Sequence, residues 1–183
     1  MKPSCPLFDA PFYFLRHGET ETNRLGLVSG QQDVELSETG WRQARAAVGR
    51  LSGRGIDAIY SSPLKRARDT ASCIAEALLL DIVIVPDLAE RNWGELEGKP
   101  RDLRVRGATP RSGEGPEIFT RRTLAGFASI RSGAVPLVVA HSGTFRVLCG
   151  ELGIARLEAA VENGRPLRIA PAPKSGSWLA EAL

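Results

Sequence analysis

Short apolar runs alternate with amphipathic helical patterns along most of the chain, and this alternation limits the fold more than any other feature. Strands that alternate with helices indicate an α/β fold whose mainly parallel central sheet is covered by helices. The sequence therefore predicts a three-layer α/β/α sandwich with a short cap segment. The expected strands are residues 12–15, 57–62, 82–86, 136–140, 167–170 and 177–180; the expected helices follow Ser37, Pro63 and Ala140 and cover 114–131, leaving 87–112 irregular.

The composition is that of an ordinary globular protein, with 43% hydrophobic and 25% charged residues. We expect residues 1–183 to form a single domain.

The start MKPSCPLFDA lacks the apolar core of a secretory signal, and no stretch is long and uncharged enough to span a bilayer. The three cysteines lack CxxC spacing, which favours reduced, mostly packed thiols in a cytoplasmic protein: Cys5, Cys73 and Cys149.

The charge balance is mildly basic, with a net charge of +3 and a pI near 9.0. This balance is compatible with an anionic ligand but is also common in proteins that bind none. We expect a small-molecule partner and neither nucleic acid nor membrane; the sequence predicts no oligomeric state. Residues 99–122 concentrate arginine among glycine and proline. A solvated loop and a phosphate-facing lid explain that segment equally well.

The chain has two histidines, and each directly follows an apolar run, in FYFLRHGE and in PLVVAHSG. Ligands of open α/β sheets bind beyond the carboxyl ends of strands, so His17, His141 and the SSP turn should meet at one edge. Neighbouring side chains of a strand point to opposite faces. Arg16 and His17 can therefore share a site only if the chain leaves strand geometry, and Gly18 supplies that freedom. The helix expected after His141 begins with unpaired N–H groups, which favour an anion such as phosphate.

Five sequence elements follow one another in a recognisable order: RHGETETN, LSETG, YSSPLKRARDTA, LAERNWGELEG and VVAHSGTFR. From about Phe12 to about Leu152 the chain resembles the histidine phosphatase superfamily, the phosphoglycerate-mutase-like proteins. The resemblance implies that His17 accepts the phosphoryl group and that Glu90 donates and accepts the proton. It further implies that the phosphoryl oxygens are held by Arg16, Arg66 and His141, and that Asn23, Ser29 and Gly30 line the phosphate pocket.

The chemistry of these residue types agrees with those roles. An imidazole attacks phosphorus only when it is unprotonated, and nearby guanidinium groups favour the neutral ring. Arginine forks pair bidentately with phosphate oxygens and stabilise the charge that spreads over them during transfer. Glu90 could protonate the leaving alkoxide and later activate water. A phosphohistidine divides one difficult step into two easier ones, and the scheme needs no metal and no cofactor.

The chain departs from the family pattern at three positions. Ser142 replaces a common glycine and could add a hydroxyl donor to the pocket; Leu96 replaces a tryptophan near the entrance; Gly115 stands where phosphatase-type members often have serine. The stretch between Glu90 and His141 is too short for the extended basic cap of cofactor-dependent mutases. A compact cap leaves a phosphoenzyme open to water, so we expect hydrolysis of a small phosphorylated metabolite.

Several alternatives remain at this point. A cofactor-dependent mutase, a catalytically idle phosphate-binding protein and a phosphohistidine phosphatase of partner proteins could use the same elements. A two-histidine metal site lacks HxH or HExxH spacing. Taken singly, His141 could be a satisfied core histidine, Arg66 a residue in a surface ion pair, and Glu90 the partner of Arg91 in a loop.

Overall fold

A six-stranded sheet forms the centre of the molecule in a computed structural model, which describes residues 5–131, 135–154, 161–172 and 177–183. The strand order is β3-β2-β4-β1-β5-β6. The first four strands in this order are mutually parallel, whereas β5 and β6 run antiparallel to their neighbours. The strands are β1 (Phe12–Arg16), β2 (Ala58–Ser61), β3 (Ile82–Ile84), β4 (Pro136–Ala140), β5 (Pro166–Pro171) and β6 (Trp178–Ala182).

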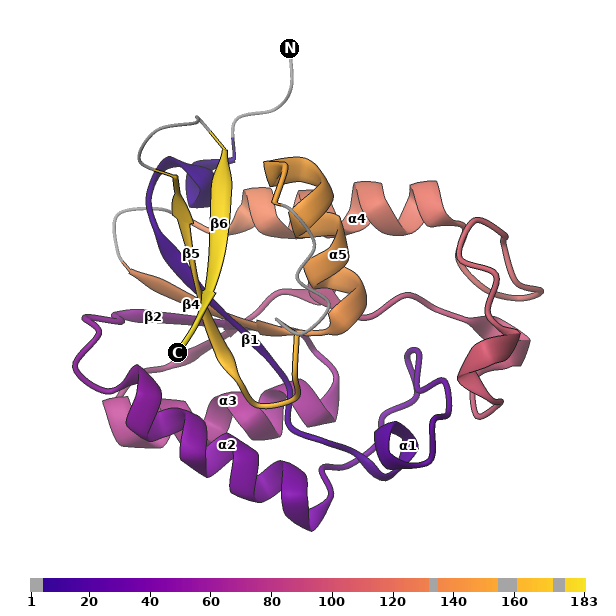
Figure 1. Cartoon of the computed structure of the whole chain (residues 1–183), viewed down its shortest axis with the longest axis horizontal. Helices are drawn as coiled ribbons and strands as arrows, with labels where there is room; N and C mark the ends of the chain where they lie inside the picture. Colours follow the sequence, from indigo (N-terminus) through magenta and orange to yellow (C-terminus); the bar gives the residue numbers. More distant parts are fainter. Residues whose placement is uncertain (1–4, 132–134, 155–160, 173–176) are drawn as a thin grey trace.

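Helices cover both faces of this sheet, which confirms the predicted three-layer α/β/α architecture (Figure 1). One face is covered by α2 (Glu38–Leu51) and α3 (Lys65–Leu78), and the other by α4 (Pro116–Ser129) and α5 (Ser142–Leu152). The short helix α1 (Glu21–Arg24) and most of the segment between β3 and α4 lie at the end of the sheet where β1 points (Figure 1). That segment contains three 3-10 helices, at Pro86–Leu88, Gly94–Leu96 and Arg101–Leu103.

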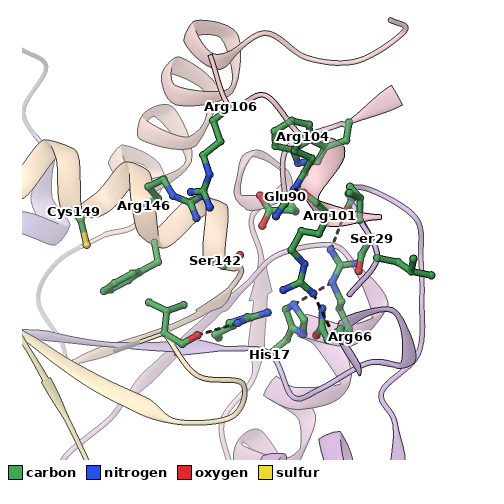
Figure 2. Close-up of a pocket in the computed structure, with 18 residues that line it drawn as sticks. His17, Ser29, Arg66, Glu90, Arg101, Arg104, Arg106, Ser142, Arg146 and Cys149 are labelled. Carbon is green, nitrogen blue, oxygen red and sulfur yellow. Dashed lines mark hydrogen bonds between the residues drawn. The ribbon is translucent and has the colours of Figure 1, made fainter. Parts of the chain in front are cut away.

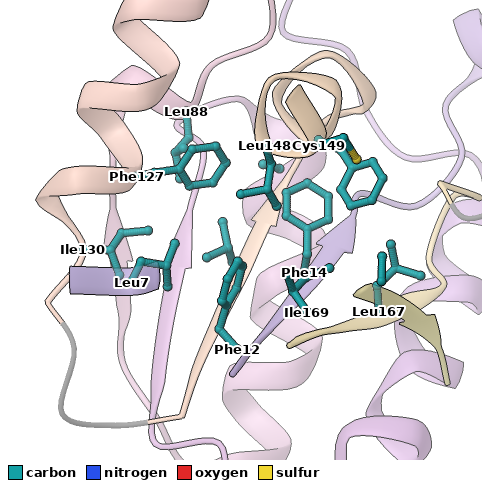
Figure 3. Packing of buried hydrophobic residues seen from close by; sticks show 14 of the residues in the cluster. Leu7, Phe12, Phe14, Leu88, Phe127, Ile130, Leu148, Cys149, Leu167 and Ile169 are labelled. Carbon is teal, nitrogen blue, oxygen red and sulfur yellow. The ribbon is translucent and has the colours of Figure 1, made fainter. Parts of the chain in front are cut away.

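The alternation of side chains along β1 explains why the sheet is buried on both faces. Phe12 and Phe14 pack with Phe127 of α4 and with residues of α5, whereas Tyr13 and Leu15 pack against α2 and α3 (Figure 3). A strand that is covered on both faces is apolar at successive positions, as FYFL is. Burial of this strand fixes β1 in the sheet and therefore fixes the position of the two residues that follow its apolar part.

Most boundaries differ from the sequence prediction by one or two residues, and three differences affect the architecture. Helix α3 begins at Lys65 rather than at Pro63, and its N-cap Leu64 accepts no side-chain hydrogen bond. Helix α1 was not predicted because it is only one turn long; Thr20 caps it by accepting a hydrogen bond from the main-chain N–H of Asn23. The two C-terminal strands extend the sheet beyond β1 as an antiparallel pair, a direction that strand patterns alone do not reveal.

None of the three cysteines forms a disulfide bond; Cys149 is buried, and Cys5 and Cys73 are partly buried. Burial raises the pKa of the Cys5 thiol to about 11, so this thiol stays protonated at neutral pH. Among the described residues, no helix has both the length and the apolar character needed to cross a membrane.

Candidate active site

A cavity of about 330 Å³ opens beyond the carboxyl end of β1, beside the first turn of α5 (Figure 2). All the residues to which the sequence assigned a catalytic or phosphate-binding role line this cavity, except His141. The prediction that these distant segments meet at one edge of the sheet is therefore correct in its geometry.

The ring of His17 is buried, with 3% of the residue exposed. Its Nδ1 lies 2.7 Å from the main-chain oxygen of Gly18, and a carbonyl can only accept, so Nδ1 carries the proton. Nε2 is then the unprotonated nitrogen, and it accepts a hydrogen bond from Nε of Arg66 over 3.3 Å. Burial, followed by the charges of Arg66 and Arg16, holds the pKa of His17 well below 6.5. The ring is therefore neutral at pH 7, with its lone pair directed toward an arginine.

Gly18 is required for a reason other than the predicted conformational freedom. Gly18 does not have the positive φ that favours glycine. A Cβ on Gly18 would lie 2.4 Å from the main-chain oxygen of Gly40, so the close approach of α2 demands glycine. The Gly18 N–H donates to Oγ1 of Thr70, whose hydroxyl donates to the Arg66 carbonyl. These contacts join the turn after β1 to α3.

Arg66 is a buried residue, with 1% exposed, and the surface ion pair considered above does not describe it. Its terminal nitrogens donate to the main-chain oxygens of Gly30 at 2.7 Å and Gln32 at 2.9 Å. Gly30 adopts a φ of +52°, which directs this turn toward the arginine and favours glycine. Burial lowers the pKa of Arg66 to about 10, so the guanidinium remains charged at neutral pH.

Arg16, the last residue of β1, lines the cavity beside His17. One terminal nitrogen donates to the Val161 carbonyl at 2.9 Å, and its buried Nε has no hydrogen-bond partner among the described residues. Burial lowers the pKa of Arg16 to about 10, against the opposing effect of Glu90. A buried, unpaired N–H on a charged group is costly, and an anion in the cavity would satisfy it.

His141 lies behind the cavity wall, fully buried, with its ring centroid 5.1 Å from that of His17. Its Nε2 lies 2.7 Å from Oγ of Ser62, the central residue of the SSP turn. Its Nδ1 has no hydrogen-bond partner in the described part of the chain, which is unlike a satisfied core histidine. Burial, followed by the charge of Arg66, holds the pKa of His141 well below 6.5.

Glu90 is oriented by main-chain donors and makes no ion pair with Arg91. Its Oε1 accepts from the Arg91 N–H at 2.8 Å, and its Oε2 accepts from the Gly143 N–H at 2.9 Å. Gly143 lies in the first turn of α5, where N–H groups are free to bind outside the helix. The helix terminus predicted to bind an anion therefore holds the carboxylate of Glu90 with one of its N–H groups.

The remaining expected residues line the cavity, although part of their hydrogen-bonding capacity is already used. The amide oxygen of Asn23 accepts from the N–H of Thr20 and from Nδ2 of Asn163, which also donates to the His17 carbonyl. The hydroxyl of Ser29 pairs with that of Thr22. Asn163 was missed because it lies outside the recognised elements, near the start of β5.

Two arginines for which no role was predicted, Arg91 and Arg122, hold the segment above the cavity, which is the part of the chain between β3 and α4. Arg91 is buried and Arg122 is partly buried. Arg91 donates to the carbonyls of Glu114, Arg106 and Ala108 at 2.6–2.8 Å. Arg122 pairs with the Glu114 carboxylate at 2.8 Å and donates to main-chain oxygens beside Glu90. The glycine- and proline-rich composition of this segment could have indicated such a role, because a loop of this kind exposes main-chain carbonyls to which a buried arginine can donate.

The outer wall of the cavity consists of Trp93 and four arginines, Arg101, Arg104, Arg106 and Arg146. Leu96, expected near the entrance, lines neither this cavity nor the one beside it. Arg146 belongs to the VVAHSGTFR element, although no role was predicted for it. Within the described ranges, no group of three or more His, Cys, Asp or Glu side chains is arranged to hold a metal ion.

The fold and this arrangement of two buried histidines, one buried and one partly buried arginine, and one carboxylate define a recognised class of phosphate-handling proteins. The match to a family model over residues 12–170 shows that the chain belongs to the histidine phosphatase superfamily, branch 1. The superfamily named from the sequence is thus confirmed.

Curated relatives include both phosphatases and mutases by name. The chain is 40% identical over 151 residues to a bifunctional protein of Mycobacterium tuberculosis, covering 73% of this chain and 42% of that protein. It is 37% identical to the uncharacterized phosphatase PhoE of Bacillus subtilis, covering 75% of each, and 36% identical to a probable phosphoglycerate mutase GpmB of Yersinia pestis, covering 70% and 68%. The chain thus spans less than half the length of the mycobacterial relative.

Solved structures share the fold over nearly the whole chain. A putative alpha-ribazole-5'-P phosphatase from Escherichia coli superimposes with a TM-score of 0.80 at 28% identity, covering 95% of both chains. A mycobacterial glucosyl-3-phosphoglycerate phosphatase in complex with VO3 gives a TM-score of 0.74 at 25% identity, covering 94% and 97%. These likenesses support an enzyme of the phosphatase or mutase type.

Proposed function

We propose that the protein hydrolyses a phosphomonoester of a small metabolite through a phosphohistidine formed on His17. The observation that carries the proposal is the state of the His17 ring: Nδ1 is fixed on the Gly18 carbonyl, and the unprotonated Nε2 lies 3.3 Å from Nε of Arg66. A phosphoryl group held by that arginine lies directly before the nucleophilic lone pair. Proximity of this kind removes much of the entropic cost of the attack.

In the first half-reaction, the Nε2 lone pair of His17 forms a bond to phosphorus while the bond from phosphorus to the ester oxygen breaks. Arg16 and Arg66 stabilise the charge on the three equatorial oxygens. In the tautomer that carries its proton on Nδ1, His141 completes this set by donating a hydrogen bond to a phosphoryl oxygen. Glu90, in its protonated form, gives its proton to the departing oxygen, so that a neutral alcohol leaves.

In the second half-reaction, water attacks the phosphohistidine. The Glu90 carboxylate takes a proton from the water as its oxygen bonds to phosphorus, and the nitrogen–phosphorus bond breaks. His17 recovers its lone pair, Glu90 recovers its proton, and inorganic phosphate leaves. Every charge in this cycle is supplied by side chains of the chain itself, so we propose that hydrolysis proceeds with neither a metal ion nor a cofactor.

Phosphoglycerate mutase activity is the second candidate, since one named relative is a probable mutase. A mutase must retain its intermediate and exclude water while the product turns over. The segment above this cavity is short, and two of its arginines, Arg101 and Arg106, are exposed to solvent. Hydrolysis is therefore the better proposal. Cysteines without disulfide bonds also agree with a reducing compartment such as the cytoplasm.

The decisive experiment is rapid-quench trapping of the phosphoenzyme with a labelled phosphomonoester. Wild-type protein should carry an acid-labile, base-stable phosphoryl group, and His17→Ala should carry none and release no phosphate, although its circular dichroism is unchanged. A chelator should leave the wild-type rate intact, and vanadate should inhibit. Turnover by His17→Ala, or loss of turnover in chelator that one divalent metal restores, would overturn the mechanism.

A further inference from the structure

The arginines that line the cavity exceed what a phosphoryl group requires. Six arginines and a single carboxylate, Glu90, occur among its described lining residues. Arg16 and Arg66 lie beside His17 and suffice to bind a phosphoryl group, whose charge is about −1.5 to −2 at neutral pH. Four more arginines surround the outer part of the cavity: Arg101, Arg104 and Arg106 before α4, and Arg146 on α5.

The three outer arginines that precede α4 have no ion-pair partner in the part of the chain that the structure describes. No carboxylate of the described residues forms an ion pair with Arg101, Arg104 or Arg106. Burial, together with the charges of Arg101 and Arg106, lowers the pKa of Arg104 to about 10. Clustered cations that repel one another destabilise the folded protein, and a bound anion would relieve this repulsion.

Hydrogen bonds from Arg91 hold the main chain that carries these arginines. Arg91, 5% exposed, donates to the carbonyls of Arg106 and Ala108, and its guanidinium lies 4.3 Å from the ring centroid of Trp93. The guanidinium of Arg104 lies 5.2 Å from the same ring, and its Nε donates to the Arg101 carbonyl. Positioned cations of this kind bind an anion with less loss of side-chain entropy than free surface arginines would.

A second cavity of about 400 Å³ adjoins the first and shares with it Glu90, Trp93, Arg104, Arg106, Ser142 and Arg146. Its far wall comes from α4 and α5 and combines apolar side chains, Phe119, Leu124 and Val147, with the polar side chains of Thr120 and Glu151. Figure 2 shows Arg106 and Arg146 reaching toward the pocket from the segment before α4 and from α5. Because Glu90 lies at the junction, a leaving group that it protonates would extend past these arginines into the second cavity.

We infer that the substrate is a phosphomonoester whose alcohol carries a second anionic group, a carboxylate or a phosphate, bound by Arg104 and Arg106. Arg101 and Arg146 add to the positive field around that group. The inference rests on the proposed phosphatase function, whose nucleophile and proton donor set the direction in which the alcohol leaves. It names a substrate class that the relatives' differing names do not define.

The test compares three esters that share one carbon skeleton: propyl phosphate, phosphorylated hydroxypropanoate and the bisphosphate of propanediol. Wild-type protein should hydrolyse one or both anion-bearing esters with a kcat/KM at least about 10-fold above that of propyl phosphate, the size expected for one charge-assisted hydrogen bond. The two anionic esters decide whether the group is a carboxylate or a phosphate. Added salt should reduce the preference, because the outer arginines are partly exposed.

Arg104→Gln and Arg106→Gln should each reduce the ratio of kcat/KM for the preferred anionic ester to that for propyl phosphate by about 10-fold. Arg111→Gln is the matched control, since Arg111 belongs to the same segment, lines neither cavity and carries the same charge. It should leave the ratio unchanged. An equal effect of all three substitutions would show a general electrostatic field and would overturn the inference.

The failure of this inference can be told apart from the failure of the proposed function. If wild-type protein forms phosphohistidine but hydrolyses all three esters equally well, the second anion site is wrong and the phosphatase stands. If no ester is hydrolysed and no phosphoenzyme forms, the phosphatase is wrong. Calorimetric titration of His17→Ala with the same esters then still decides the site: tighter binding of an anionic ester supports it, and equal binding overturns it.

Discussion

The Gly143 N–H donates to the carboxylate of Glu90 at 2.9 Å, and a Cβ on Gly143 would lie 1.9 Å from the other carboxylate oxygen. Gly143 is buried in the first turn of α5. The glycine therefore provides both the donor that holds Glu90 and the space that Glu90 occupies. A change at a residue with no ionisable group should act on the proton donor.

We predict that Gly143→Ala slows hydrolysis of alkyl phosphates by about 100-fold or more, because the new methyl group displaces Glu90 from the departing oxygen. Alanine favours helix, so the fold should persist. Gly49→Ala is the control: Gly49 lies within α2, a Cβ there would meet no atom within 4 Å, and its rates should equal those of wild type. Wild-type rates for Gly143→Ala would mean that the position of Glu90 is unimportant.

Glu90→Gln separates proton transfer from positioning. Glutamine keeps the shape and, through its single oxygen, the contact with the Gly143 N–H, but it loses the contact with the Arg91 N–H and has no acidic proton to give. Alkyl phosphates should therefore slow by about 100-fold to 10,000-fold. p-Nitrophenyl phosphate should slow far less, because its phenolate departs without a proton. The measurement is phosphoenzyme formation in single turnovers, since Glu90 also serves the later water attack. Equal slowing for both leaving groups would assign Glu90 an orienting role.

Ser62 should set the tautomer of His141. Oγ of Ser62 accepts from the Leu64 N–H, which leaves its hydroxyl proton free for Nε2 of His141 at 2.7 Å. Nδ1 then carries the ring proton. We predict that Ser62→Ala changes the ¹⁵N shifts of the His141 ring and weakens vanadate binding by about 10-fold. Ser72→Ala, at an exposed position on α3, should change neither. Unchanged ring shifts in Ser62→Ala would show that the serine has no part in the tautomer.

Stability should fall with acid more steeply than carboxylates alone would cause. Burial holds the pKa values of His17 and His141 well below 6.5 in the folded chain. The unfolded chain takes up protons near pH 6.5 and the folded chain does not, so the free energy of unfolding falls as pH drops below that value. The slope is about 1.4 kcal/mol per pH unit for each histidine.

Urea unfolding of wild type and His141→Gln at several values between about pH 7 and pH 5 measures this slope. The variant should lose the contribution of one histidine, whatever its stability at pH 7. If the free energy of unfolding fell with the same slope in both proteins as the pH drops, the fold would not hold His141 neutral.

We expect Arg91 to stabilise the conformation of the segment above the cavity. Arg91→Gln removes donors to the carbonyls of Arg106, Ala108 and Glu114. We predict a loss of about 2–4 kcal/mol in the free energy of unfolding, or faster amide exchange confined to residues 101–114, because buried carbonyls lose their partners. Amide exchange in β4 should stay slow if the loss is local. A stability and an exchange pattern equal to those of Arg111→Gln would contradict this role.

The recognised elements allowed most of the site to be predicted because their chemistry is local to the chain. RHG after an apolar strand and HSG after another placed His17 and His141 at strand ends, and parallel strands bring such ends together. Glu90 and Arg66 followed from the same ordered elements. The strand and helix segments were also predictable, because the first four positions of β1 are apolar and α2 and α3 carry regular apolar faces.

Only the tertiary structure showed why several of these residues matter. Gly18 is glycine because α2 approaches it, and Gly143 because Glu90 fills its place, and both neighbours are distant in sequence. The structural roles of Arg91 and Arg122 could not be predicted from the sequence, because most of their partners are main-chain carbonyls, which every residue has. The sequence by itself determined which chemical groups are present and the order of the elements that carry them. Packing decided their protonation, their orientation and the excess of positive charge around the cavity, because burial and distance exist only once the chain has folded.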